Sequence, residues 1–515
     1  MSRDFKFFYP IPLAVFFSLH FSLTLNAQNI GNLPEFNLPL TWYESHLRFL
    51  ASDELKGRRA GSAGNKVAAR YIAEKFRIFG LRQATGAEGY FQQIPFHKII
   101  PAKGGSLRIG ENQFFYGENL LWLSAEGYEG TTEVVWAGNG WVDEAKGIDD
   151  FKGKVVKGKV VVIASGFPGA TSAREVWRAA TKKRAFAKER GAIALIEVYR
   201  ERIPWQFVKK QFMGERLTPV MDTTHFSNSG DMPHAFVQEN KKELESMLLS
   251  GKRLNAKFTG NLIAGSEKML KVPNVIGIIQ GSDPDLKEEY ILLSAHFDHV
   301  GVGKQGGTTT PTDSIFNGAR DNGMGVVALL SAAQALATAP PKRSVICLAV
   351  NAEEIGLLGS AYYAENPLIP LNQTIFNLNT DGAGYTDTMA VSIIGMNRVG
   401  VEAEFQHACD TLGLRIYVDP APEANLFDRS DNVSFARKGI PAPTLSPGFA
   451  EFGPELFKVY HQVSDEVSTI NWSYLRLFAR TYAYSARLIA DKEVRPFWIS
   501  GDKYEEAGKK LYNIK

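Results

Sequence analysis

Residues 273–490 alternate continuously apolar runs with helical patterns, and this alternation restricts the possible fold of the 515-residue chain more than any other feature. Three of the runs are "YILLSAH" (290–296), "RSVICLAV" (343–350) and "TIFNLNT" (374–380). Runs without polar alternation are typical of strands buried on both faces. Because helical patterns such as "GVVALLSAAQALAT" (325–338) separate them, the sequence predicts an α/β fold. We expect a mostly parallel, doubly wound sheet flanked by helices.

Two further segments complete the predicted main domain. "NVIGIIQG" (274–281) comes before "YILLSAH", and an acidic turn around residues 283–285 separates the two, so we expect them to pair as neighbours. "NWSYLRLFARTYAYSARLIADK" (471–492) has the pattern of a long closing helix. The main domain is therefore assigned to residues 263–495, with a C-terminal tail at 496–515.

Residues 115–262 have a different texture from the rest of the chain. Short β-rich runs, "GTTEVVWAG", "GKVVVIAS" and "AIALIEVY", surround one helical stretch that ends at Gly191. We interpret this segment as a β-rich domain inserted into the main one. Residues 28–114 would then be the N-terminal part of the main domain, and they include a helix whose apolar positions are Ala68, Ala69, Ile72, Ala73 and Phe76.

The first 27 residues resemble a secretory signal peptide. A short charged start, "MSRDFK", precedes an apolar run, and "LNA" stands before Gln28 like a cleavage site with small residues. Pro10 and Pro12 interrupt the apolar run, which argues against a stable spanning helix. We expect a secreted or periplasmic protein with no stable membrane insertion after cleavage. An uncleaved membrane anchor is the alternative.

Charge and cysteine content exclude several classes of protein. The net charge is +3 and no block of lysine or arginine occurs, so nucleic acid is not an expected partner. The chain has two cysteines, which excludes a disulfide scaffold.

Polar side chains follow the predicted strands at the points where the strands end. In an open α/β sheet, ligands bind at the carboxyl ends of the strands. The candidate residues at or near this edge are two histidines and five carboxylates: His296, Asp298, Asp321, Glu353, Glu354, Asp381 and His461. His299 also lies near this edge, and we expect it to serve the turn.

Imidazole and carboxylate ligands without a thiol suit Zn²⁺, Mn²⁺ or Co²⁺, and they argue against a closed structural zinc site. Two divalent ions need a bridging carboxylate and can hold a hydrolytic water between them. Of the adjacent pair Glu353-Glu354, one carboxylate can bind metal while the other acts as general base. Asp298 is expected to accept a hydrogen bond from the second ring nitrogen of His296.

Five motifs resemble, in order and spacing, those of the M28 family of co-catalytic zinc peptidases. They are "AHFDHVG", "GARDNGMG", "NAEEIGLLGSAYYAEN", "NLNTDGAG" and "YHQVSDE". The similarity extends to "LASDELKGRRAGSAGNKVAARYIAEKF" near the start and to "SDNVSFARKGIPAPTLS" before the last histidine. The segment 115–262 resembles a protease-associated (PA) domain.

The resemblance implies a role for each matching residue. His296 and Asp381 would hold one zinc ion, Glu354 and His461 a second, and Asp321 would bridge the two. Glu353 would be the general base, with Asp298 behind His296. The role of Asp431, in "RSDN", stays open.

The resemblance also implies a secreted aminopeptidase that acts on peptides, with the PA-like domain restricting access to the cleft. Arg320 departs from the family pattern, because many relatives have an acid at that position. Three alternatives remain. A carboxypeptidase-like relative would use Arg320 and Arg429. A glutaminyl cyclase-like enzyme would use a single zinc ion. A non-catalytic receptor would have the peptidase fold without the peptidase activity.

Overall fold

The computed structural model describes residues 36–514 except for a few short segments. The segments left out are 101–103, 125, 167–172, 202–203, 221–231, 240–243, 245, 247–256, 263–265 and 304–305. The predicted signal peptide, with its alternative as a membrane anchor, lies outside the described residues. Within them, no helix has both the length and the apolar character that crossing a membrane requires.

Within the described residues, nine strands form the main sheet, in the order β10-β1-β13-β17-β14-β18-β21-β19-β20. Their bounds are β10 (Arg216–Pro219), β1 (Phe91–Ile100), β13 (Ser266–Ile279), β17 (Ser344–Val350), β14 (Tyr290–His296), β18 (Thr374–Thr380), β21 (Thr444–Pro447), β19 (Ala390–Ile394) and β20 (Arg415–Val418). The four central strands, β17, β14, β18 and β21, are parallel, and antiparallel pairs occur towards both margins. The α/β architecture is confirmed, and the sheet is a mixed one.

The expected pairing of residues 274–281 with residues 290–296 is wrong. These segments lie in β13 and β14, and β17 lies between them: it runs antiparallel to β13 and parallel to β14. The side chains of β14, β17 and β18 are almost all buried, so each of these strands needs a neighbour on both edges as well as cover on both faces. Adjacency in sequence carried no information about that third strand.

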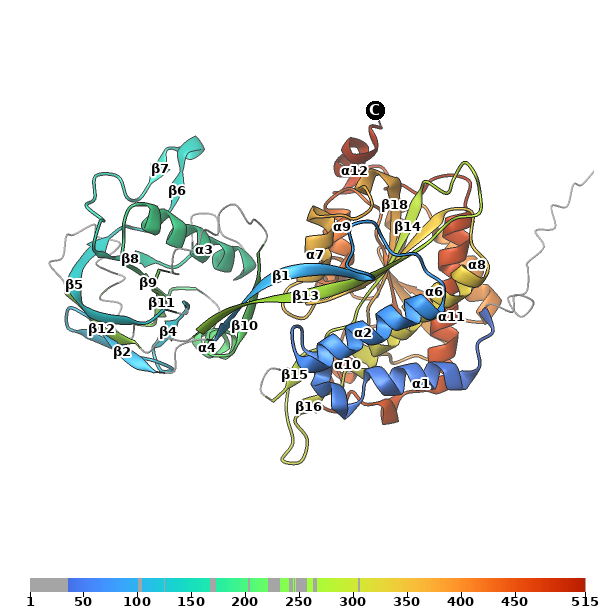
Figure 1. Ribbon diagram of the computed structural model, residues 1–515, viewed down its shortest axis with the longest axis horizontal. Coiled ribbons are helices and arrows are strands. Elements are labelled where there is room, and N and C mark those ends of the chain that lie inside the picture. Colours follow the sequence, from blue (N-terminus) through green and yellow to red (C-terminus); the bar gives the residue numbers. More distant parts are fainter. Residues whose placement is uncertain are drawn as a thin grey trace, which may run out of the picture.

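Helices cover both faces of the main sheet (Figure 1). On one face, α1, α2, α6, α8 and α11 pack against one another, whereas α7 and α9 are in contact on the other. The bounds are α1 (Leu40–Leu50), α2 (Ala63–Ile78), α6 (Met324–Thr338), α7 (Leu358–Glu365), α8 (Glu402–Leu412), α9 (Asn432–Ala436), α10 (Pro454–Phe457), α11 (Trp472–Asp491) and α12 (Glu505–Tyr512). Almost every side chain of α6 is buried, as expected of a helix that is apolar on all sides.

The helix predicted from the alanine-rich pattern is α2. Its five predicted apolar positions are all buried, and the Ser62 hydroxyl caps its start by accepting a hydrogen bond from the Asn65 amide at 3.2 Å. Just before it, the short 3₁₀ helix η3 (Asp53–Arg58) ends in residues with positive φ, including Arg58 at 36°. That turn directs the Arg58 side chain into the interior.

A second sheet lies apart from the first and, within the described residues, has eight strands in the order β3-β2-β12-β5-β8-β9-β11-β4. Their bounds are β2 (Gly105–Ile109), β3 (Asn112–Phe115), β4 (Leu120–Trp122), β5 (Tyr128–Trp136), β8 (Val160–Ala164), β9 (Ala194–Val198), β11 (His234–Val237) and β12 (Lys257–Leu262). Two hairpins, β6 (Val142–Asp143) with β7 (Ile148–Asp149) and β15 (Gly301–Val302) with β16 (Ile315–Phe316), stand outside both sheets. Helices α3 (Ala173–Glu189) and α4 (Trp205–Phe212) accompany the second sheet.

This second sheet starts earlier in the chain than the boundary of 115 that we expected. The hairpin β2–β3 belongs to it, because β2 pairs with β12 and places Leu107 and Ile109 in a core with Phe258. The hairpin has only two inward-facing apolar positions on β2, which is too short a pattern to identify from the sequence. β1 and β13 pair along ten residues and run as one ribbon between the two sheets (Figure 1).

Candidate metal centre

The structure gathers the candidate residues at the carboxyl edge of the central strands. His296 ends β14, Glu353 and Glu354 come shortly after β17, and Asp381 directly follows β18. Asp321 lies in the turn η5 (Ala319–Gly323) before α6, and His461 lies in the loop between α10 and α11. Five loops therefore meet where the parallel strands end, as the sequence pattern indicated.

Two triads share one carboxylate. In the first, His296 Nε2 lies 3.1 Å from Asp381 Oδ1 and 3.3 Å from Asp321 Oδ1. In the second, His461 Nε2 lies 3.0 Å from Glu354 Oε2 and 3.2 Å from Asp321 Oδ2. The two oxygens of Asp321 thus face opposite triads, which is the arrangement of a bridging carboxylate.

The donor atoms fit a pair of zinc ions. Zinc–nitrogen and zinc–oxygen bonds of about 2.0–2.2 Å in a tetrahedral site place neighbouring ligand atoms about 3.3 Å apart. The four distances within the triads, 3.0 to 3.3 Å, agree with that spacing. His296 Nδ1 lies 3.2 Å from the main-chain carbonyl of Asp298 and donates a hydrogen bond to it, which leaves Nε2, on the side of the carboxylates, as the nitrogen that could bind a metal ion.

The charges of the cluster also call for a cation. Burial favours neutral imidazole at His461, but Glu354 and Asp321 outweigh it and raise the pKa of His461 to about 11. Burial and Asp321 act to raise the pKa of Glu354, yet His461 and His299 lower it to about 2. The carboxylates therefore draw positive charge onto the histidines, and a divalent ion would supply that charge directly.

Glu353 belongs to neither triad. It lines the pocket beside His296, and its pKa is raised well above the usual range by burial and by the neighbouring carboxylates of Glu354 and Asp381. Within this adjacent pair, Glu354 faces His461 and Glu353 faces the pocket. The geometry thus separates a carboxylate within a triad from one that faces the pocket.

Asp298 differs in detail from the expectation. Its carboxylate lies 4.0 Å from His296 Nδ1, which instead contacts the main-chain carbonyl of the same residue. Asp298 Oδ1 accepts a hydrogen bond of 3.1 Å from the Glu353 amide. The carboxylate therefore joins the loop after β14 to the loop after β17, and burial raises its pKa to about 6.

His299 is a member of the cluster rather than only a turn residue. It is fully buried, and its Nδ1 donates a hydrogen bond of 2.6 Å to Glu354 Oε1, on the side of the carboxylate opposite His461. The sequence signal was present in "HFDH", but on an extended chain His299 points to the other face from His296 and Asp298. The turn after β14 brings it back.

Other side chains fix the ligands from behind. Asp465 accepts hydrogen bonds from the amides of Arg320 and Asp321 at 2.9 and 3.1 Å. Ser430 donates to Asp381 Oδ2 at 2.5 Å, and Ser446 donates to the Asp381 carbonyl. Asp431, whose role was left open, is fully buried at the start of α9, and burial raises its pKa to about 7.

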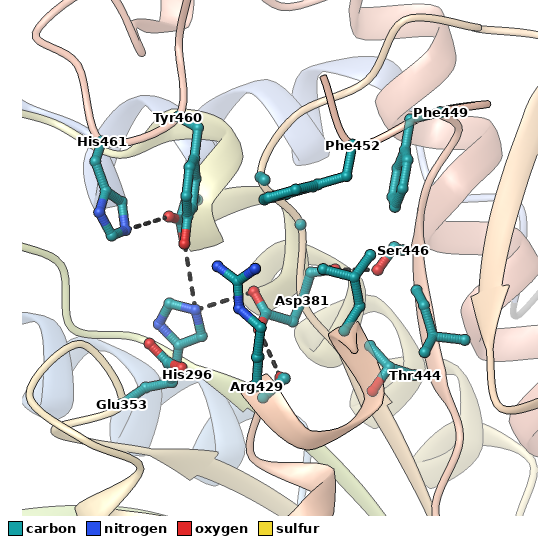
Figure 2. Close-up of a pocket in the computed structure, with 16 residues that line it drawn as sticks. His296, Glu353, Asp381, Arg429, Thr444, Ser446, Phe449, Phe452, Tyr460 and His461 are labelled. Carbon is teal, nitrogen blue, oxygen red and sulfur yellow. Dashed lines mark hydrogen bonds and ion pairs between the residues drawn. The ribbon is translucent and has the colours of Figure 1, made fainter. Parts of the chain in front are cut away.

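A pocket with a cavity of about 80 Å³ opens beside the first triad (Figure 2). Its apolar wall consists of Ile394, Leu426, Phe449 and Phe452, and Arg429 also lines it. An apolar cavity next to a set of convergent polar groups is the usual form of a small-ligand site.

Tyr460 is a pocket residue that the sequence analysis did not select. Its ring lies 4.1 Å from the ring of His461, and Figure 2 shows both side chains above His296 and Asp381. Burial and the nearby carboxylates raise its pKa well above the usual range, so the phenol keeps its proton and is a hydrogen-bond donor. Its place next to His461 in "VYHQV" was the only available signal.

An α/β sheet that carries two histidine–carboxylate triads with a shared aspartate belongs to the class of metal-dependent hydrolases. Comparison with known proteins agrees. Residues 274–486 match the sequence profile of peptidase family M28. This segment, which carries both triads, is therefore similar to peptidase family M28.

Individual relatives match smaller parts of the sequence. A vacuolar membrane protease of Lachancea thermotolerans is 33% identical over 153 residues, which are 30% of this chain and 14% of that protein. Leucine aminopeptidase 2 of Trichophyton equinum is 27% identical over 289 residues, 52% of each chain. The chain thus spans about half of the second relative and a small part of the first.

The fold is found among solved structures. The aminopeptidase from Aneurinibacillus sp. strain AM-1 has 20% sequence identity and a TM-score of 0.53, covering 87% of this chain and 93% of the other. At this identity the similarity concerns the fold, which extends across both sheets of the present chain.

Proposed function

We propose that the chain is a dinuclear zinc aminopeptidase that removes residues from the amino termini of peptides. The proposal rests mainly on the carboxylate of Asp321, because one of its oxygens faces His296 and the other faces His461. His296, Asp321 and Asp381 would hold one ion, and Asp321, Glu354 and His461 the other. Manganese or cobalt would suit the same ligands.

Zinc, when bound, supplies Lewis acidity that polarises a carbonyl group and lowers the pKa of water. Glu353 accepts a proton from the attacking water and returns it to the leaving nitrogen as the peptide C–N bond breaks. The Tyr460 hydroxyl donates a hydrogen bond to the oxyanion that develops on the substrate. Asp298 keeps the Glu353 amide, and hence the general base, in place.

One carboxylate outside both triads favours the amino end of a peptide over its carboxyl end. Glu353 lines the pocket without belonging to a triad, so it can attract an ammonium group after two ions have neutralised the carboxylates of the triads. Arg320 is directed elsewhere: it stacks on Tyr385 at 4.3 Å and donates to the Thr469 carbonyl at 2.9 Å. Arg429 does line the pocket, and it is the one observation that favours the carboxypeptidase-like alternative.

The second sheet and residues 1–27 also have roles in this function. The second sheet, with its helices, is a PA-like domain that restricts access to the cleft, and residues 1–27 direct export to a secreted or periplasmic location. The β1–β13 ribbon supports the first point, because it connects the domain directly to the main sheet.

Metal removal is the first test. We expect the purified chain to contain about two zinc equivalents and to cleave leucyl reporter peptides with a free amine, but not their N-acetylated forms. Chelation should abolish the activity, and added zinc should restore it. Activity confined to reporters with a free carboxyl terminus would assign the carboxypeptidase-like reaction. One zinc equivalent with cyclisation of amino-terminal glutamine would assign the cyclase.

The apolar wall predicts a preference for apolar amino-terminal residues. Replacing Ile394 with tryptophan places a larger side chain in the cavity of about 80 Å³, so hydrolysis of leucyl substrates should slow more than that of alanyl ones. We expect the leucyl-to-alanyl ratio of kcat/KM to fall about 10-fold or more. Both rates come from one variant, so a loss of folded protein does not affect the ratio. An unchanged ratio would place the substrate side chain elsewhere.

A further inference from the structure

Arg58 lies beneath the candidate metal centre, and it has no carboxylate partner in the part of the chain that the structure describes. Its side chain is fully buried, and within the described residues no acidic oxygen lies within ion-pair distance of its guanidinium group. An arginine in the interior normally pairs with an acid, because burying an unpaired charge is costly. Its hydrogen bonds show what stabilises it instead.

All five N–H donors of Arg58 bond to main-chain carbonyls. Nε donates to Phe297 at 2.8 Å, and one Nη2 hydrogen donates to Gly318 at 2.7 Å. The other bonds reach Asp321 at 3.3 Å, Leu50 at 3.2 Å and, over a shorter distance, Asn317. One side chain therefore holds the loop that follows His296 and the loop that contains Asp321.

These two loops carry ligands of both triads. The Phe297 carbonyl belongs to the residue next to His296, and the Gly318 and Asp321 carbonyls belong to the turn that holds the bridging carboxylate. A shift of either loop would separate His296 Nε2 from Asp321 Oδ1, which now lie 3.3 Å apart. Arg59 adds a weaker bond to the same region, from Nη1 to the Val300 carbonyl at 3.3 Å.

The charge of Arg58 acts in the same direction. Burial lowers the pKa of Arg58, whereas the carboxylates of Asp321, Asp465, Asp298 and Glu354 act in the opposite direction and favour its charged form. A permanent cation beneath them offsets part of their mutual repulsion.

We propose that Arg58 is a positioning residue for the metal centre, which aligns His296 and the bridging Asp321 and thereby sets the affinity for zinc. The inference rests on the proposed zinc function and adds to it a residue far from the ligands in sequence. Lysine keeps the charge but has three donors, so an Arg58→Lys variant loses at least two of the five hydrogen bonds.

Arg343 offers a matched control. It is 1% exposed, pairs with Glu289 at 2.7 Å and donates to main-chain carbonyls at the end of α11. It precedes β17, whereas the site follows the other end of that strand, about 20 Å away for seven residues. Arg343→Lys therefore removes a buried arginine fork without touching the loops of the site.

The test is a zinc titration of the purified full chain against a chromogenic chelator of known affinity. We expect Arg58→Lys to weaken zinc binding about 10- to 100-fold, with turnover largely restored at saturating zinc. Arg343→Lys should lower Tm but leave zinc affinity unchanged within about twofold. If the two variants lose the same amount of Tm and zinc affinity is unchanged in both, Arg58 has a structural role only and the inference is wrong.

Two further outcomes are decisive. If Arg58→Lys does not fold, Asn65→Ala replaces it, because Asn65 Nδ2 holds the Arg58 carbonyl at 3.1 Å. We then expect a smaller loss of zinc affinity in the same direction, and an unchanged affinity would contradict the proposal. If the wild-type chain itself binds no zinc, the proposed function fails and this inference fails with it.

Discussion

Replacing Glu353 with glutamine is expected to reduce kcat about 10²- to 10⁴-fold while the zinc content stays at the wild-type level. The amide has nearly the same shape as the carboxylate but cannot accept a proton from water. Glu353 belongs to neither triad, so its loss leaves the ligand set complete. Burial already disfavours charge at this position, so a neutral amide should not disturb the fold.

The neighbouring residue is the control for this substitution. Glu354→Gln changes one atom in the same segment, but Glu354 Oε2 lies 3.0 Å from His461 Nε2 within the second triad. We expect this variant to lose zinc as well as activity. Metal analysis and steady-state kinetics on both variants separate a proton-transfer role from a ligand role. Loss of zinc in Glu353→Gln, or full activity without the carboxylate, would contradict the assignment.

The same pair of variants also tests the non-catalytic receptor reading. A receptor on this fold has no use for a general base, so Glu353→Gln would leave its partner binding unchanged. Turnover of free-amine peptides by the wild-type chain, together with its loss in this variant, would exclude that reading.

The positions of the candidate ligands were predictable because a parallel sheet places the ends of its strands along one edge. His296, Glu354 and Asp381 each follow a buried strand, so their convergence needed only the order of apolar runs. Asp321 and His461 lie in connecting loops, and the resemblance of whole motifs to a family was needed to select them. The structure brings all five together.

The groups that support the ligands were not predictable in the same way. Arg58 contacts Phe297, Asn317 and Asp321 across 239 to 263 residues of sequence, and no local pattern reports such a contact. His299 lies on the opposite face of an extended chain from His296 until the turn after β14 reorients it. Such contacts depend on how loops turn, and hydrophobic periodicity carries no information about loops.

Strand neighbours and domain limits depended on similar long-range contacts. β13 and β14 are consecutive in sequence, but each pairs with β17, which comes later in the chain. The hairpin β2–β3 joins the second sheet through β12, which lies almost 150 residues further along. In both places the deciding partner was a strand distant in sequence.

Replacing Asp321 with asparagine should have a still larger effect than the general-base substitution, because it acts on both triads at once. Asparagine presents one oxygen and one NH₂ group, and the NH₂ group cannot bind a metal ion. The two oxygens of Asp321 face His296 at 3.3 Å and His461 at 3.2 Å, so one of the two contacts must be lost and the bridge with it. We expect zinc content to fall from about two equivalents to well below one, with activity at the background level.

Asp381→Asn is the control for Asp321→Asn, because Asp381 would bind one ion whereas Asp321 would bridge two. Of the two histidines in the triads, Asp381 contacts His296, at 3.1 Å, so this variant should lose the first ion and keep the second. Thermal unfolding with and without chelator gives an independent measure of ion binding. An ion whose free concentration is 1,000 times its Kd stabilises the folded state by about 4 kcal/mol. Chelation should lower Tm most in the wild type, less in Asp381→Asn and least in Asp321→Asn. Equal zinc contents and equal responses to chelator in the two variants would show that Asp321 does not bridge two ions.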